Sequence, residues 1–273
     1  MRKTVVAVVI AGAVATAAAA TAMARSSATI QPPPSVAAAG KIVYCTDATY
    51  PPEEYYKGSK IIGSDIDFGS GVAKLMGVKA EFKNTTFDSI IAALLAKKCD
   101  AIISGMNDTA ERRKQVSFAD YLKVGQTLMV RKGNPGHVTS LPSLSGKRVS
   151  VESGTTNRDY LAAESKKLQA QGKKPITIVT FPKDTDSVAA LKAGRVDAYF
   201  GDTPPVVYYI KHDPSLAIGY SPVSPIPIGI AIRKGDALRA ATQKAINTMY
   251  ANGTIKRILA KWEMSSAVLL LEK

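Results

Sequence analysis

Histidine and cysteine are scarce in this chain, which has two of each among its 273 residues. His137 and His212 lie in loop-like segments, away from the motifs described below. No group of metal-ligand residues stands at a suitable spacing, and no nucleophile stands beside a general base. We therefore expect no metal, no cofactor and no catalytic residue, and the pattern argues against an enzyme.

The two cysteines could form a disulfide bond in an exported chain, but we expect them to be free. Cys45 ends one predicted strand and Cys99 precedes another. If these strands are parallel neighbours, the cysteines are offset by about four residues, on the order of 13 Å at ~3.3 Å per residue. Two Cα atoms more than about 7 Å apart cannot be bridged without movement of the backbone.

A stop-transfer segment is also absent, because the one long apolar run, residues 5–21, lies at the start of the chain. Arg2 and Lys3 precede this run, and a small-x-small site ending in Ala24 follows it. This pattern is typical of a secretory signal peptide. We expect residues 1–24 to be cleaved off after Ala24 and the mature protein to be periplasmic. No cysteine lies near this site, which argues against lipoprotein processing.

The mature chain would be strongly basic. Without Arg2 and Lys3, the 36 basic residues become 34 against 22 acidic residues, a net charge of +12. The basic residues form no single block, as the separate pairs at residues 97–98, 166–167 and 173–174 show. Such pairs near helix ends complement the helix dipole. The charge therefore predicts a solvated basic surface and no nucleic-acid partner.

Short apolar segments alternate with helical patterns after a Pro/Ala/Ser-rich leader, residues 25–40, which we expect to be disordered. The predicted strands are 41–45, 79–82, 100–104, 126–131, 147–151, 176–180, 197–200 and 228–232. One predicted helix has the apolar positions Phe87, Ile90, Ile91, Leu94 and Leu95, which share a helix face. Alternating strands and helices predict an α/β fold with mainly parallel sheets.

The alternation occurs twice, which predicts two lobes. The first would comprise residues 41–122 together with the C-terminal residues 229–273, and the second residues 127–222. Two hinge crossings, at residues 123–126 and 223–228, would join the two mostly parallel sheets. The carboxyl edges of both sheets would then face one cleft.

Polar groups and a cation follow the predicted strand at residues 100–104. Ser104, Gly105 and Asn107 belong to a short turn, and Arg112 lies just inside the next helix. Open α/β sheets bind ligands at this edge, and a guanidinium can donate two parallel hydrogen bonds to a carboxylate. Arg112 taken alone favours a solvated residue on the first turn of a helix, and only its neighbours along the chain favour a binding role.

Other strand ends carry polar residues too. Asp47 and Tyr50 stand in an extended, proline-containing loop after the first strand. In the second lobe, a Gly-Thr-Thr turn at residues 154–156 presents backbone N–H groups to an anion. Asp202 ends another strand, where it could also cap a helix. We expect Ser64 or Asp65 to cap the helix after Gly63, which is a structural role.

Together these segments resemble the family 3 bacterial solute-binding proteins, the periplasmic receptors of polar amino-acid ABC importers. The resemblance covers residues 41–264 and rests on TDATYPPEE, GSDID, FDSIIAALLAKKCDAIISGMNDTAERRKQVSFADY, GKRVSVESGTT, LKAGRVDAYFGD and GIAIRKGD…ANGTIKRILAKW, in this order. It implies the two-lobed type II periplasmic-binding-protein fold. It also implies a free amino acid as ligand, a membrane permease as partner and a monomeric receptor.

The resemblance assigns roles to individual residues. Arg112 would hold the ligand α-carboxylate, helped by Thr156 and the backbone around Ser104 and Thr155. Asp202 would pair with the α-ammonium group, near Gly105 and Asn107, while Tyr50 and Phe87 would enclose the side chain. The chain departs from the family pattern in having Asn107 in place of Ser or Thr, Glu53 in place of an aromatic residue, and Ser64 in place of Phe.

The side-chain specificity is predicted from three acidic residues, Asp47, Glu53 and Glu152, which map to the distal end of the ligand. Because a buried cation needs a paired anion, we favour arginine, lysine, ornithine or histidine over glutamate. Alternatively, Glu53 and Glu152 point to solvent or pair with Lys57 or Arg148, and Asp47 orders its loop. A receptor for glutamine, glutamate or an opine remains open, as does a dehydratase-type enzyme on the same fold.

Overall fold

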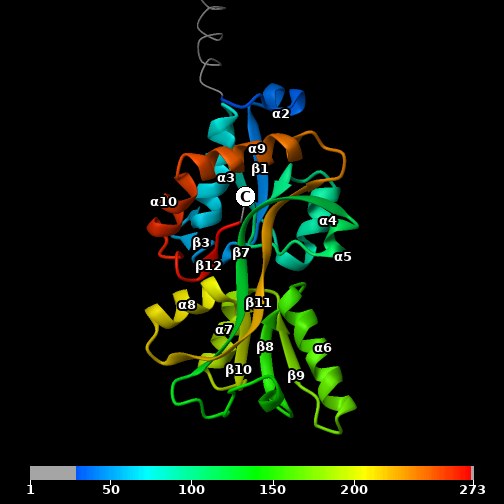
Figure 1. Ribbon diagram of the computed structural model, residues 1–273, viewed down its shortest axis with the longest axis vertical. Helices are drawn as coiled ribbons and strands as arrows, with labels where there is room; N and C mark the ends of the chain where they lie inside the picture. Colours follow the sequence, from blue (N-terminus) through cyan, green and yellow to red (C-terminus); the bar gives the residue numbers. More distant parts are fainter. Residues whose placement is uncertain (1–28, 272–273) are drawn as a thin grey trace, which may run out of the picture.

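The protein is described here by a computed structural model that covers residues 29–271, apart from the side chains of residues 222–224 (Figure 1). The predicted signal peptide and the start of the leader lie outside the described residues. Two lobes are stacked along the long axis, and the two long strands β7 (Val116–Arg131) and β11 (Leu216–Arg233) connect them. No helix in the described part is long and apolar enough to cross a membrane.

The first lobe contains both ends of the described chain. Its further elements are α2 (Pro34–Ala39), β1 (Lys41–Thr46), β2 (Thr49–Tyr50), β3 (Glu54–Lys57), β4 (Lys60–Ile62), α3 (Ser64–Leu75), β5 (Lys79–Asn84), η2 (Phe87–Ser89), α4 (Ile90–Leu95), β6 (Ala101–Ile102), α5 (Ala110–Arg113), α9 (Leu238–Ala251), α10 (Thr254–Lys261) and β12 (Val268–Leu269). β1 lies between β5 and β6, and the three strands are parallel. β2, β3 and β4 form a small antiparallel sheet that the sequence pattern did not predict.

The core of the first lobe lies on both faces of β1. Successive side chains of a strand point to opposite faces of its sheet. Tyr44 therefore packs with the buried residues of α3, α9 and α10, whereas Cys45 packs with those of α4. The last two helices of the chain thus complete the core of this lobe, and Gly253 separates them in a left-handed conformation (φ 73°).

The second lobe repeats this arrangement with fewer elements. They are η3 (Pro142–Leu144), β8 (Arg148–Glu152), α6 (Thr156–Ala170), β9 (Thr177–Phe181), α7 (Asp184–Lys192), β10 (Ala198–Asp202) and α8 (Thr203–His212). β8 pairs in parallel with both β9 and β10. On one face, Val149 and Phe200 pack against Leu161 of α6, and on the other Tyr199 packs with residues of α7 and α8.

The long strands β7 and β11 merge the two sheets into one curled sheet. β11 pairs antiparallel with β6 of the first lobe, and β7 pairs antiparallel with β10 of the second. The predicted strands 126–131 and 228–232 are only the ends of these longer strands. Pro225 and Pro227 lie in β11, and its register against β7 shifts repeatedly between Ile218 and Gly229. Prolines and bulges interrupt a ladder, which is why the sequence indicated junctions here.

Residues 29–40 are ordered, so the prediction of a disordered leader was wrong for this part. A proline begins helix α2, and Gly40 ends it with a φ of 65°. Ile30 and Val36 are buried in the core of the first lobe, and the N–H of Ile30 donates to the carbonyl oxygen of Leu75 (3.0 Å). Two apolar anchors suffice to dock the segment, and its Pro/Ala/Ser-rich composition concealed them.

Cys45 and Cys99 form a disulfide bond, so the prediction that they are free was also wrong. The error was to extend strand geometry as far as Cys99. β6 consists of only two residues, and Cys99 precedes it in a bend of the chain. The N–H of Asp100 donates to the carbonyl oxygen of Val43 (2.7 Å), and the bend brings the two cysteine Cα atoms to 5.7 Å.

Candidate binding site between the lobes

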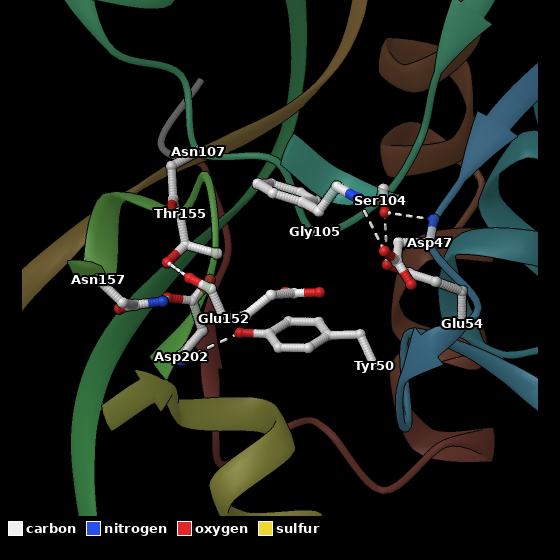
Figure 2. A pocket seen from close by; sticks show the side chains of 11 residues that line it. Asp47, Tyr50, Glu54, Ser104, Gly105, Asn107, Glu152, Thr155, Asn157 and Asp202 are labelled. Atoms are coloured by element: carbon white, nitrogen blue, oxygen red, sulfur yellow. Dashed lines mark hydrogen bonds between the residues drawn. The ribbon is translucent and has the colours of Figure 1, made fainter. Parts of the chain in front are cut away.

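A pocket lies between the lobes, where strands β1, β6, β8 and β10 end (Figure 2). The space in it that protein atoms do not fill is about 280 Å³, open solvent included. The lining residues come from both lobes and are Asp47, Tyr50, Glu54, Phe87, Ser104, Gly105, Asn107, Glu152, Thr155, Asn157 and Asp202. Figure 2 shows Asp47 and Ser104 at one end and Asn157 and Asp202 at the other, with Tyr50 between them.

The first end, which we call the acidic end, consists of Asp47, Glu54 and Ser104. The Ser104 hydroxyl accepts a hydrogen bond from the N–H of Asp47 (2.9 Å) and donates one to Oε1 of Glu54 (2.8 Å). Oε2 of Glu54 is buried without a hydrogen-bond partner among the described residues. Burial raises the pKa of Glu54 well above its usual value, and the charges of Asp65 and Glu53 raise it further.

The Asp47 carboxylate also orders its own loop. Oδ1 accepts a hydrogen bond from the Thr49 hydroxyl (2.8 Å), and Oδ2 accepts one from the N–H of Phe87 (2.8 Å). Burial raises the pKa of Asp47, although these hydrogen bonds lower it. Asp47 thus combines the loop-ordering role considered from the sequence with a place on the pocket wall.

The opposite end, which we call the clamp end, consists of Asn107, Thr155, Asn157 and Asp202. Asp202 is the residue before helix α8, but its side chain makes no capping hydrogen bond. Oδ1 instead accepts a hydrogen bond from Nδ2 of Asn157 (3.2 Å), while the Asp202 N–H donates to the Tyr50 hydroxyl (3.1 Å). Burial raises the pKa of Asp202 to about 6, while the hydrogen bond from Asn157 and the charge of Arg112 lower it.

Arg112 lies behind the clamp end. Its guanidinium donates to the carbonyl oxygens of Asn107 (2.9 Å) and Gly154 (3.2 Å), and it stands 5.3 Å from the centre of the Phe87 ring. Only 8% of the residue is exposed, and burial lowers its pKa. Arg112 is therefore not the solvated helix residue that the sequence alone allowed, and its bond to Gly154 joins the two lobes.

The start of helix α6 faces the same end. Thr155 caps the helix by accepting from the N–H of Arg158 (3.3 Å), and its hydroxyl donates to the carbonyl oxygen of Glu152 (2.8 Å). The Thr156 hydroxyl donates to Oδ1 of Asn107 across the lobes (2.5 Å). Thr155 thus caps the helix and also lines the pocket, and the first turn of a helix offers N–H groups that can bind an anion.

Carboxyl groups dominate the surroundings of the pocket. Four line it, Asp47, Glu54, Glu152 and Asp202, and three lie behind its walls, Glu53, Asp65 and Asp184. None is more than 4% exposed, and burial is the largest cause of a raised pKa in each. Arg112 is the single buried Lys or Arg among the described residues. The basic protein thus encloses an acidic pocket.

The sequence allowed Glu53 and Glu152 to point to solvent or to pair with Lys57 or Arg148, and the structure shows neither arrangement. Glu152 is 4% exposed and Glu53 is fully buried, so neither points to solvent. Arg148 lies 3.7 Å from Asp197, and Lys57 is exposed. One oxygen of Glu152 and both oxygens of Glu53 lack hydrogen-bond partners among the described residues.

The structure brings nine of the twelve predicted site residues into the pocket lining: Asp47, Tyr50, Phe87, Ser104, Gly105, Asn107, Glu152, Thr155 and Asp202. The other three, Glu53, Arg112 and Thr156, lie just behind it. Sequence reasoning missed Glu54 and Asn157. Each adjoins a predicted residue, and the missed signal was the exact start of β3 and of α6, which decides which of two neighbours faces inward.

The predicted capping of helix α3 was wrong. Gly63 precedes the helix, and neither Ser64 nor Asp65 makes a capping hydrogen bond. The Asp65 side chain instead accepts from the N–H of Gly105 (2.8 Å) and from the Tyr121 hydroxyl (2.7 Å). Asp65 therefore fixes the turn that forms the pocket wall.

No cluster of His, Cys, Asp and Glu that could hold a metal ion exists in residues 29–271.

The sequence that forms this two-lobed structure matches a known family. The profile of the Bacterial extracellular solute-binding proteins, family 3, matches residues 42–265. The chain belongs to this family. It is 33% identical over 233 residues to the ABC transporter arginine-binding protein 1 of Escherichia coli strain K12, covering 83% of this chain and 92% of that protein.

Solved structures agree with this assignment of the solute-binding protein. An ancestral arginine-binding protein bound to arginine shows 37% identity and a TM-score of 0.76, covering 82% of this chain and 98% of that one. The ancestral amino acid-binding protein AncCDT-1, a precursor of cyclohexadienyl dehydratase, shows 33% identity and a TM-score of 0.76. The match covers 84% of this chain and 97% of that one. The two-lobed fold expected from the sequence is thereby confirmed.

Proposed function

We propose that this solute-binding protein is the receptor of an ABC importer and binds a free basic amino acid between its lobes. The observation that carries the proposal is the composition of the pocket surroundings, where seven buried carboxyl groups occur with one buried guanidinium. An acidic ligand side chain would be repelled, whereas a cationic one would supply the missing counter-charge. The arginine-binding relatives support the same ligand class.

The clamp end suits the part shared by all free amino acids. Asp202 would pair with the α-ammonium group, which would in turn lower the raised pKa of that carboxyl. The α-carboxylate would lie at the first turn of α6 and accept hydrogen bonds from Arg112. Two of the five guanidinium donors already bond to carbonyl oxygens, so the ligand would share or replace the bond to Gly154.

The acidic end suits the distal cation of the ligand. Oε2 of Glu54 and Oε1 of Glu152 are buried acceptors without partners among the described residues. A guanidinium or ammonium group would satisfy these oxygens, and the Tyr50 and Phe87 rings would flank the intervening methylene groups. The remaining site residues, Gly105, Asn107, Thr155 and Thr156, would shape the pocket.

The proposal also covers the cellular setting and the motion of the protein. We place the mature, monomeric receptor in the periplasm, where it would deliver its ligand to a membrane permease. Ligand would close the lobes at the hinge crossings, because the proposed clamp groups come from both: Arg112 from the first lobe and Asp202 from the second. Contacts such as Asn107–Thr156 would then form on closure.

A calorimetric titration series tests the ligand class. We expect one or more of arginine, lysine, ornithine and histidine to bind with micromolar or tighter affinity, about −8 kcal/mol or more favourable. Small-angle scattering at saturating ligand should show compaction. Tight binding of glutamate, glutamine or an opine, with no binding of any basic amino acid, would contradict the specificity but keep the amino-acid clamp.

A dehydratase-type enzyme is the second candidate, because AncCDT-1 is described as a precursor of such an enzyme. That ancestral protein is itself described as amino acid-binding, which favours a receptor function over an enzymatic one for this chain. The buried acids with raised pKa values, Glu152 above all, are the groups that such chemistry could use. Turnover of prephenate or arogenate by the purified protein would favour the enzyme; binding without turnover would favour the receptor.

A further inference from the structure

Glu53 is a fully buried acid directly behind the pocket. Its N–H donates to the carbonyl oxygen of Tyr50 (3.0 Å), and its own carbonyl oxygen accepts from the N–H of Asp65 (2.9 Å). The backbone is therefore fixed, and the side chain has no exposed surface. Both carboxyl oxygens lack hydrogen-bond partners among the described residues. A structural carboxylate would be expected to have such partners.

The carboxyl group of Glu53 lies close behind two residues of the pocket lining. A Cβ atom built on Gly105 would lie 3.6 Å from Oε1 of Glu53 and 3.3 Å from Cε1 of Tyr50. Gly105 and Tyr50 both line the pocket. A charge inside the pocket therefore acts on Glu53 through a thin and water-poor wall, where charges interact strongly.

The groups around Glu53 do not neutralise a negative charge. The titratable groups that face it are Asp65 on α3, Asp184 on α7, Asp202 at the end of β10, the adjoining Glu54 on β3, and the hydroxyls of Tyr50 and Tyr121. Burial raises the pKa of Glu53 well above its usual value, and the charges of Asp65, Asp202 and Asp184 raise it further. An ionised Glu53 would add one more like charge to this group.

Among these carboxyl groups, Asp65 is better placed to ionise than Glu53. Asp65 accepts hydrogen bonds from the N–H of Gly105 and from the Tyr121 hydroxyl, and these bonds stabilise its charged form. Its pKa rises only to about 6. Glu53 accepts no hydrogen bond from the described residues, so nothing comparable favours its ionisation.

We propose that Glu53 couples ligand binding to proton release: it is protonated in the ligand-free protein and gives its proton to solvent when a cationic side chain enters the pocket. This inference rests on the proposed function. The O–H bond of Glu53 breaks and the proton passes to water or buffer. The positive charge of the ligand then compensates the negative charge of the Glu53 carboxylate. Because the complex binds fewer protons, affinity for a cationic ligand falls as the pH falls through the ligand-free pKa of Glu53.

Calorimetry with L-arginine tests this coupling, near pH 6.5 and in two buffers that differ in protonation enthalpy. Glu53→Gln keeps the shape of the side chain but cannot ionise, and Glu111→Gln removes an exposed carboxylate (side chain 75% exposed) as the control. Wild type and Glu111→Gln should release protons on binding. Glu53→Gln should release at least ~0.3 protons fewer per arginine bound. Equal release from all three proteins would overturn the proposal.

A second measurement uses the wild-type protein and stays valid if Glu53→Gln fails to fold. The infrared difference spectrum on adding arginine should show loss of the carbonyl-stretching band of a protonated carboxylic acid. An unchanged band would overturn the coupling. If no basic amino acid binds at all, the proposed function fails; if one binds without releasing protons, only this inference fails.

Discussion

A methyl group on Gly154 of the second lobe would lie 2.7 Å from the Cα atom of Asp88 in the first. Such a distance is shorter than van der Waals contact, and the opposing atom belongs to the backbone. The lobes can therefore come this close only because residue 154 has no side chain. Gly154 also carries the carbonyl oxygen that Arg112 contacts.

Gly154→Ala should weaken ligand binding about tenfold or more, because the lobes could no longer close fully around the ligand. Gly172→Ala is the matched control. Gly172 lies in the same lobe and has a similar positive φ (73° against 77°), but nothing lies within 4 Å of its added Cβ. Calorimetry on both variants separates the clash from backbone strain, and equal affinities would contradict closure at this point.

Arg112→Ala should remove most of the binding while the fold persists. The ligand α-carboxylate would lose its buried partner, a loss on the order of 2–5 kcal/mol. Arg158→Ala, which removes a guanidinium that contacts the neighbouring Asp159 on the surface, should bind like wild type. Calorimetric titration with the ligand that binds the wild type most tightly measures the affinity of both variants. An affinity of Arg112→Ala within about threefold of wild type would show that Arg112 does not hold the α-carboxylate.

Glu54→Gln should lower the affinity for arginine about tenfold, or ~1.4 kcal/mol. The amide oxygen can still accept from Ser104, so the loop should keep its geometry, but one of the two carboxyl groups at the acidic end is lost. Glutamine, if it binds to the wild type, should lose much less affinity. A competition titration of the two ligands checks this, and equal losses for both would place the distal cation elsewhere.

Removing the Cys45–Cys99 disulfide should destabilise the protein by about 2–4 kcal/mol. The bond closes a loop across 54 positions in sequence, which restricts the unfolded chain. Urea unfolding of the Cys45→Ala/Cys99→Ala double variant measures the loss. A reducing agent should lower the stability of the wild type but not of the variant, and an insensitive wild type would argue against the bond.

Periodicity predicted the parts of the fold that local patterns determine. The helix through Ile90 and Leu94 buries an apolar face together with Cys45 of β1 and Ile102 of β6, so its type follows from spacing. The strand ends then placed Asp47, Ser104 and Asp202 at one edge, because parallel strands share a direction.

The wrong predictions concern residues whose contacts are made with segments far away in the sequence. Asp65 has the sequence context of a helix cap, but Tyr121 and Gly105, far along the chain, take its carboxylate. Cys99 stands beside a strand that is only two residues long, a length that pairing with β1 and β11 sets. Neither interaction leaves a trace in the local pattern, which also explains why Ile30 and Val36 were not expected in the core.

Asp184 should make the ligand-free protein less stable at neutral pH than at mildly acidic pH. It is the first residue of α7 and is 1% exposed, and the Tyr199 and Tyr209 hydroxyls donate to its two oxygens (2.5 and 3.2 Å). Burial raises its pKa to about 7 despite these bonds. An unfolded Asp titrates near 3.9. The folded state therefore binds the extra proton, and the stability that this adds is complete below pH ~4 and is lost as the pH rises through about 7.

Urea unfolding at pH 5 and pH 8 measures this effect. The wild type should be more stable at pH 5 by at least ~1 kcal/mol, with Asp65 and Asp202 contributing in the same direction because their pKa values are also raised, to about 6. Asp184→Asn should reduce the difference, since an amide takes up no proton in this range. Asp186→Asn, an exposed position on the same turn of α7, should leave it unchanged. Equal pH dependence in wild type and Asp184→Asn would show that Asp184 is ionised in the folded protein throughout, and that the polar neighbours outweigh its burial.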